Sequence, residues 1–140
     1  MKLKISQNYS FGKLKTKIDD LMNESVKQYA KKTEEGSKQK INRGLKKLQP
    51  VTVKIRQHRG QPVRPALKAS GKLYNSIKQV DNTLEIVEYG VRHHEGFITG
   101  EGSIIPNVEV PARPFISTTL KSKKEITKQF TKSVNKSLKK

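Results

Sequence analysis

The stretch FISTTLKSKKEITKQFTKSVNKSL, residues 115–138, decides much of the fold because two repeats of period four run through it. The first repeat is apolar and comprises Ile126, Phe130, Val134 and Leu138. Phe115 and Thr119 precede this repeat in the sequence. The second lies two positions away and comprises Lys124, Lys128, Lys132 and Lys136. Two positions correspond to about 200° of an α-helix. The stretch therefore predicts an amphipathic C-terminal helix with an apolar face opposite a lysine row.

Each face of this predicted helix has more than one interpretation. The apolar face must be covered, either by a sheet of the same chain or by a neighbouring subunit. The lysine row is opposed only by Glu125. It is either a solvated surface or a contact for phosphate groups or an acidic protein.

The N-terminal part of the chain has the same helical period. Apolar and small side chains recur every three or four positions at Phe11, Leu14, Ile18, Leu21, Met22, Ser25 and Tyr29, which predicts an amphipathic helix. Ser10 is a candidate N-cap for it. The period resumes over residues 41–48, so either one helix bends at Gly36 or two helices meet there. Pro50 is expected to end this helical region.

The middle of the chain is typical of short strands and loops. Residues 51–56 alternate apolar and polar side chains, which predicts a half-buried strand. Residues 57–65 contain Gly60 and two prolines and predict an exposed loop, either a plain connector or a binding loop. Ser70 is a candidate cap for a short helical turn after it.

A hairpin is predicted next, with strands over residues 77–80 and 83–89 and the turn pair Asp81-Asn82 between them. Residues 97–103 predict a flexible loop, and residues 104–110, interrupted by Pro106, predict an edge strand. The sequence thus predicts an α+β fold with a long N-terminal helix, a small antiparallel sheet of about four strands and a C-terminal amphipathic helix. We expect a single domain, residues 1–140, made of a helical arm (1–50), a sheet module (51–111) and the C-terminal helix (112–140).

The charge of the chain indicates either a highly solvated surface or an anionic partner. Thirty Lys and Arg residues face twelve Asp and Glu residues, which gives a formal net charge of +18. The excess lies at the ends, because residues 1–50 and 112–140 each carry a net +8 and residues 51–111 carry +2. Twenty-four of these cations are Lys, which lacks the bidentate base reading of Arg. If the partner is nucleic acid, we expect non-specific binding, and a small basic non-specific nucleic-acid-binding protein is therefore one alternative for the function.

Motifs for catalysis or metal binding are not recognisable in the sequence. The chain has no cysteine, and His93-His94-Glu95 lacks the four-residue histidine spacing of helical zinc sites. A packing role or backbone hydrogen bonds at a loop are expected for these imidazoles. Neither a nucleophile elbow nor a phosphate-binding glycine loop is present. We therefore expect no enzyme activity, no metal and no cofactor. Without a long apolar run or a signal peptide, we expect a soluble protein made in a cytoplasm.

Three segments in the second half resemble the tail-completion and head–tail joining proteins of long-tailed phages, a virion morphogenesis family. Residues 67–77, LKASGKLYNSI, resemble its Leu-x-x-Ser/Thr-Gly-x-Leu-x-x-Ser-Ile segment. Residues 87–97, VEYGVRHHEGF, resemble its strand and Tyr-x-x-x-His-x-x-Gly turn. Residues 110–116, VPARPFI, resemble its most specific motif, which directly precedes a terminal helix. The agreement covers residues 67–140. Two features depart from a minimal member of the family: the glycine-containing loop over residues 96–102, with the stretch 104–109 after it, is longer, and the chain contains more lysines.

The resemblance implies a structural role without catalysis. It implies that copies of the chain form a ring, of about six subunits, at the neck of the virion. The ring would contact the tail tube or tail terminator on one side and head-completion or connector proteins on the other. Assembly would take place in the host cytoplasm, the protein would reside in the virion neck or tail, and no membrane is implied. Non-specific contact with passing DNA is a further option.

Ring formation assigns roles to the patterns described above. The residues expected at the interface between subunits are Arg113, Phe115, Ile126, Phe130, Val134 and Leu138. Arg113, which lies between two prolines, has a second interpretation as an intramolecular lock on the terminal helix. The residues expected to contact DNA or an acidic partner are Lys124, Lys128, Lys132 and Lys136.

Overall fold

The computed structural model describes residues 11–139, and these form five helices and four short strands. In chain order they are α1 (Phe11–Arg43), α2 (Pro50–His58), α3 (Lys72–Ser76), β1 (Lys78–Val80), β2 (Thr83–Glu85), α4 (Glu88–Glu95), β3 (Phe97–Ile98), β4 (Glu109–Val110) and α5 (Leu120–Leu138). The predicted α+β class and the two long helices are confirmed. The four strands form two separate antiparallel pairs, β1–β2 and β3–β4. The predicted cap at Ser10 lies outside the described residues.

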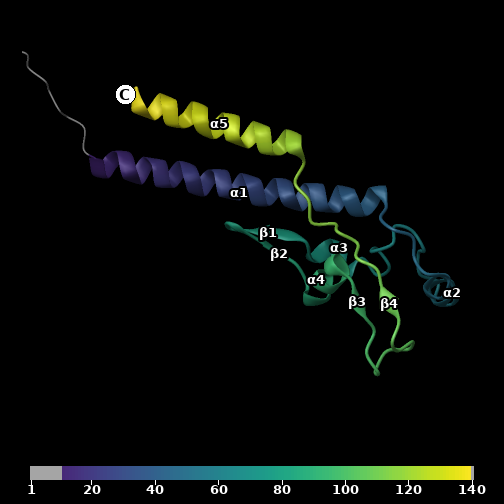
Figure 1. Cartoon of the computed structure of the whole chain (residues 1–140). Helices are drawn as coiled ribbons and strands as arrows, with labels where there is room; N and C mark the ends of the chain where they lie inside the picture. Colours follow the sequence, from purple (N-terminus) through teal and green to yellow (C-terminus); the bar gives the residue numbers. More distant parts are fainter. Residues whose placement is uncertain (1–10, 140) are drawn as a thin grey trace, which may run out of the picture.

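Helices α1 and α5 form a two-helix arm. Helix α1 has 33 residues, about 50 Å, and α5 runs back along it toward its N-terminal end (Figure 1). Thr119 caps α5, because its Oγ1 accepts a hydrogen bond from the Ser122 amide at 3.1 Å. Ile126, Phe130 and Val134 are half-buried on the side of α5 that packs on α1. The apolar face of α5 is thus covered in part by α1 of the same chain, and not by a sheet as one of the two sequence-based alternatives expected.

Helix α1 continues through Gly36 as one helix, so the alternative in which two helices meet at Gly36 is wrong. The segment that leads into α5 crosses α1 at this point. A Cβ atom at Gly36 would lie too close to the carbonyl oxygen of Ser117. The Ser117 amide donates a hydrogen bond to the buried Ser37 Oγ at 3.1 Å, and the hydroxyls of Thr33 and Thr118 share another. Glycine therefore permits a close backbone approach here.

Replacing Gly36 with alanine is expected to destabilise the protein, although this change normally stabilises a helix by about 1 kcal/mol. The added methyl group must displace backbone, and such overpacking typically costs about 1–3 kcal/mol. Because the blocking atom belongs to the backbone of Ser117, we expect a cost in the upper part of this range. Urea denaturation should then show a net loss of about 1–2 kcal/mol in the free energy of unfolding. Gln39→Ala, at an exposed position of the same helix, is the control and should be close to neutral. A Gly36→Ala protein as stable as wild type would contradict the close crossing.

The β1–β2 hairpin lies along α1 on the side opposite α5 (Figure 1). Lys78 pairs with Glu85 and Val80 with Thr83, and Asp81 adopts the positive φ expected of the turn, at 49°. The Gln79 amide donates a hydrogen bond to Glu34 Oε2 at 2.7 Å, which ties the hairpin to α1. Hydrogen bonds from Lys38 and from this amide lower the pKa of Glu34. The predicted hairpin is confirmed, but its second strand ends at Glu85.

Two predicted strands are helices in the structure. Residues 51–56 belong to α2, in which Pro50 occupies the first turn instead of ending a helical region. In the first turn a backbone amide has no hydrogen-bond partner within the helix, so the amide hydrogen that proline lacks is not missed. The fixed φ of proline also suits the start of a helix. Helix α1 has already ended at Arg43, and Gly44 turns the chain with a φ of 98°. Residues 88–89, predicted to end a strand, instead begin α4.

The β3–β4 pair is shorter than the predicted edge strand and includes two residues predicted to be loop. Phe97 pairs with Val110 and Ile98 with Glu109. Between them Thr99 organises the connection, because its Oγ1 donates to the Ile105 carbonyl at 2.6 Å and accepts from the Val108 amide at 2.8 Å. Asn107 turns the chain with a φ of 56°. The β3–β4 pair thus consists of two residues in each strand, and beyond it the hydrogen bonds of Thr99 hold the connecting loop.

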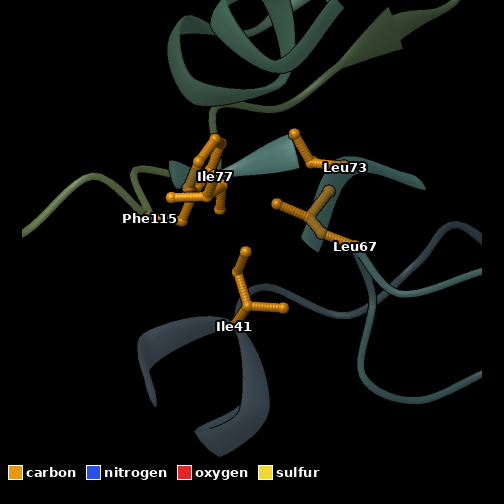
Figure 2. Close-up of a cluster of buried hydrophobic side chains, with 5 residues drawn as sticks. All are labelled: Ile41, Leu67, Leu73, Ile77 and Phe115. Atoms are coloured by element: carbon orange, nitrogen blue, oxygen red, sulfur yellow. The ribbon is translucent and has the colours of Figure 1, made fainter. Parts of the chain in front are cut away.

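The hydrophobic core lies at the C-terminal end of α1. Five buried side chains form it, and Figure 2 shows them converging: Ile41, Leu67, Leu73, Ile77 and Phe115. Phe115, Ile41 and Ile77 have no exposed surface. The side chains come from α1, from the segment around α3 and from the strand-like segment before α5. The core thus joins parts of the chain that are up to 74 residues apart, from Ile41 to Phe115.

Candidate functional site

The three segments that carry the family resemblance meet in this core. Leu67, Leu73 and Ile77 come from the first segment and Phe115 from the third. The second segment contributes Gly90, which is buried in α4. A Cβ atom there would lie 2.7 Å from Leu73 Cδ1, so a larger residue at position 90 would displace the Leu73 side chain from its place in the core. These segments therefore act together as one packed unit.

Arg113 connects this unit to the chain between α1 and α2. Its side chain is 3% exposed. Nε donates to the Lys46 carbonyl at 3.2 Å, Nη2 to the Lys47 carbonyl at 3.2 Å and Nη1 to the Pro111 carbonyl at 3.4 Å. Burial lowers the pKa of Arg113. Of the two interpretations of Arg113, these contacts agree with the intramolecular lock, but the lock holds residues 46–47 instead of the terminal helix.

Arg56 plays a comparable part on α2, which the sequence did not suggest. Its Nη2 donates to the Ala66 carbonyl at 2.6 Å and its Nη1 to the Pro62 carbonyl at 3.1 Å. The predicted loop over residues 57–65 begins only after His58, where α2 ends, and these two hydrogen bonds tie it back to α2. Within residues 11–139, the ion pairs are Lys32–Glu35, Lys38–Glu34 and Arg92–Glu88, so neither Arg56 nor Arg113 is paired with a carboxylate. Both guanidinium groups serve as clamps on backbone carbonyls.

The two adjacent histidines pack in different directions from α4, as expected for neighbours on a helix. The His94 ring contacts Phe115 edge-on, with centroids 5.5 Å apart, and its Nδ1 accepts a hydrogen bond from the Ile116 amide at 3.3 Å. The His93 ring contacts Tyr89 and Phe97, with centroids 6.2 and 5.3 Å away. His93 Nδ1 is buried without a hydrogen-bond partner in the described chain. The packing and backbone roles predicted for the imidazoles are confirmed, but the two residues belong to helix α4 and not to the predicted loop.

The environment of His93 predicts a pH dependence of stability. Burial lowers the pKa of His93, and the charges of Arg113 and Arg56 lower it further. The unfolded chain titrates near the ordinary pKa of about 6.5, so below that pH it binds more protons than the folded chain. Stability is then fully present above about pH 6.5 and is lost as the pH falls toward the folded pKa.

We expect the thermal midpoint of the wild-type protein to fall between about pH 7.5 and about pH 5, and to fall less for His93→Gln. His58→Gln, at an exposed position, is the matched control and should follow the wild-type curve. If the thermal midpoint depended on pH in the same way for wild type and His93→Gln, the pH dependence could not be attributed to His93.

An open groove of about 250 Å³ lies between α2 and the β3–β4 hairpin. Thr52 and Ile55 line it on the α2 side, and Ile105 and Val108 line it on the hairpin side. Arg56, His93 and Arg113 also line it. The groove is mainly apolar with a cationic side, and it opens on the same module that contains the three family-like segments.

The structure divides the predicted interface residues among three environments. Arg113 and Phe115 are inside the chain, at 3% and 0% exposed, so they have no surface to offer a neighbouring subunit. Ile126, Phe130 and Val134 are half-buried on the α1 side of α5, and Leu138 is 50% exposed at its end. The predicted set is therefore not a continuous surface. Its first two members stabilise the fold.

Other apolar side chains are exposed on the arm and were not assigned to an interface by the sequence. Met22, Val26 and Tyr29 of α1 are 52%, 44% and 42% exposed. On a helical projection they lie between the face that contacts α5 and the face that contacts the β1–β2 hairpin. We call these three residues the α1 strip. The sequence did contain a sign of this exposed strip, because the apolar repeat of the N-terminal helix is wider than the surface that a single packing partner can cover.

The predicted lysine row is fully on the surface. Lys124, Lys128, Lys132 and Lys136 are all exposed, and Lys121 falls on the same side of α5. None of the ion pairs within residues 11–139 involves α5.

In residues 11–139, no group of three or more His, Cys, Asp or Glu side chains is placed to hold a metal ion. Over the same residues, no helix has the length and apolar character needed to cross a membrane. Comparisons with protein-family models, with curated proteins and with solved structures found no match to this chain.

Proposed function

We propose that this chain is a non-catalytic subunit of a ring at the neck of a long-tailed phage, where it completes the tail and joins it to the DNA-filled head. The observation that carries the proposal is the convergence of residues 67–77, 87–97 and 110–116 in one core. Separate matches of this kind can arise by chance. Their joint packing is what we expect if the motif residues maintain one common fold.

The surface of the arm supports an assembly of several copies. The α1 strip exposes three large apolar side chains on one helix, and such patches often mark interaction sites. The two short strand pairs also leave edges that a neighbour can extend. We propose a closed ring of copies of this chain, with the α1 strip at the contact between neighbours. The other proposed partners are the tail tube or tail terminator and the head-completion or connector proteins.

A conditional mutant of the gene tests this function. With an amber codon early in the gene, a host without a suppressor should accumulate DNA-filled heads and separate tails, visible by negative-stain electron microscopy. A suppressor host should produce joined particles and restore infectivity, which controls for effects on other genes. Complete infectious particles in the non-suppressing host would contradict the proposal. Complete particles are also the result expected if the chain only binds nucleic acid and is not needed to join heads to tails.

A further inference from the structure

We propose that the outer face of α5 binds the phosphate backbone of duplex DNA through a row of five lysines. The row comprises Lys121, Lys124, Lys128, Lys132 and Lys136, all of which are exposed. This inference goes beyond the neck function, because it depends on the geometry of one helix and not on where the ring is placed in a virion.

The row is regular and nearly uncompensated. Successive lysines from Lys124 to Lys136 lie about 6 Å apart along the helix, and the whole row from Lys121 spans about 22 Å. Its members lie within about 120° of the helix circumference. Glu125 is the acidic residue of α5. A DNA strand carries a phosphate about every 3.4 Å of helix axis, so a line of flexible ammonium groups can follow it without a fixed register.

The other face of α5 argues against a membrane as the partner. An amphipathic lysine-rich helix binds a lipid surface by inserting its apolar face. In this chain Ile126, Phe130 and Val134 are half-buried in the packing of α5 on α1. That face is therefore not available unless the arm opens.

The composition of the row argues against an acidic protein as the principal partner. Protein interfaces are enriched in aromatic residues, Met and Arg, and they are depleted in Lys. The side chains between the lysines on this face include Glu125, Thr131 and Asn135, and none of these is aromatic or apolar. Lysines alone supply charge without base recognition. The row fits an extended polyanion that is bound without sequence preference.

The test is the salt dependence of binding to a random-sequence DNA duplex, measured by fluorescence anisotropy with the full chain. The row variant carries Lys124→Gln, Lys128→Gln, Lys132→Gln and Lys136→Gln. The control variant carries Lys54→Gln, Arg59→Gln, Arg64→Gln and Lys72→Gln, which are exposed positions on α2, α3 and the loop between them. Both variants lose four positive charges, so they separate the row from the total charge.

We expect wild type and control variant to bind the duplex with affinities within about threefold of each other. We expect the row variant to bind about 100-fold more weakly near physiological salt, with a log–log salt slope shallower by about 3–4. Thermal melting of each variant should show that the fold is retained. A variant with only Lys124→Gln and Lys128→Gln, and one with only Lys132→Gln and Lys136→Gln, should each bind with an affinity between those of wild type and the row variant.

Three results would overturn the proposal. The first is a row variant that binds as wild type does, and the second is an equal loss in the control variant. The third is displacement of the duplex by polyglutamate as effectively, per charge, as by unlabelled duplex, which would indicate an acidic protein partner. None of these measurements involves virion assembly, so they can fail while the amber experiment succeeds.

Discussion

Replacing Phe115 with alanine is expected to lower the free energy of unfolding by about 3–5 kcal/mol, the usual range for a buried Phe→Ala change. Phe115 has no exposed surface and packs in the core with Ile41, Leu67, Leu73 and Ile77 (Figure 2). It also contacts the His94 ring edge-on. The substitution would leave a cavity at the place where α1, α4 and the segment before α5 meet. Urea denaturation followed by circular dichroism measures the loss.

The chain offers a matched control for this prediction. Phe11 is 85% exposed, so Phe11→Ala should change stability by no more than about 0.5 kcal/mol. If Phe115→Ala cost no more than the control, Phe115 would not be part of a packed core. It would then again be available as a contact to a neighbouring subunit.

Replacing Arg113 with lysine should destabilise the protein by about 2 kcal/mol, because hydrogen bonds to a charged group are worth about 1.5–3 kcal/mol each. The guanidinium group donates in three directions, to the carbonyls of Lys46, Lys47 and Pro111. A lysine ammonium is a single point and cannot reproduce this planar fork. At least one of these three carbonyls would lose its hydrogen bond to residue 113.

Arg92→Lys is the control for this second prediction. The Arg92 side chain is 67% exposed and lies 3.7 Å from Glu88, so the exchange should be nearly neutral. A stable Arg113→Lys protein that fails to assemble would contradict the lock and favour the interface role. A protein that loses stability as a monomer supports the lock.

The parts of the fold that the sequence predicts well are those with long, regular patterns. The α5 repeat continues through four apolar positions, and the α1 repeat covers more than half of its helix. The Asp81-Asn82 turn was also predictable, because these residues tolerate a positive φ. In each case the signal is local, and tertiary contacts only reinforce it.

Short segments gave the wrong predictions for reasons that can be identified. Six alternating residues after Pro50 suit a strand or a short helix equally, and the proline at the first helical turn was the better signal. Helix α4 has an acidic residue, Glu88, in its first turn and Arg92, His93 and His94 in its last. This charge arrangement favours a helix, but the apolar run before it suggested a continuing strand.

The contacts of the candidate site were beyond the reach of sequence patterns. Two of the three carbonyls that Arg113 binds, those of Lys47 and Lys46, lie 66 and 67 residues away along the chain. The requirement for glycine at positions 36 and 90 likewise comes from distant segments, Ser117 in one case and Leu73 in the other. Such constraints depend on the assembled tertiary structure. Sequence motifs identified which residues matter, and the structure identifies most of them as elements that hold the module together.

Locating the protein in purified infectious particles tests the central claim, that the chain is a ring subunit of a phage neck, most directly. Gold-labelled antibody against the chain should decorate the junction between head and tail in electron micrographs. Quantitative mass spectrometry should give a copy number of one small ring, about six or twelve per particle. Absence of the chain from infectious particles, or label spread over the head, would contradict the account.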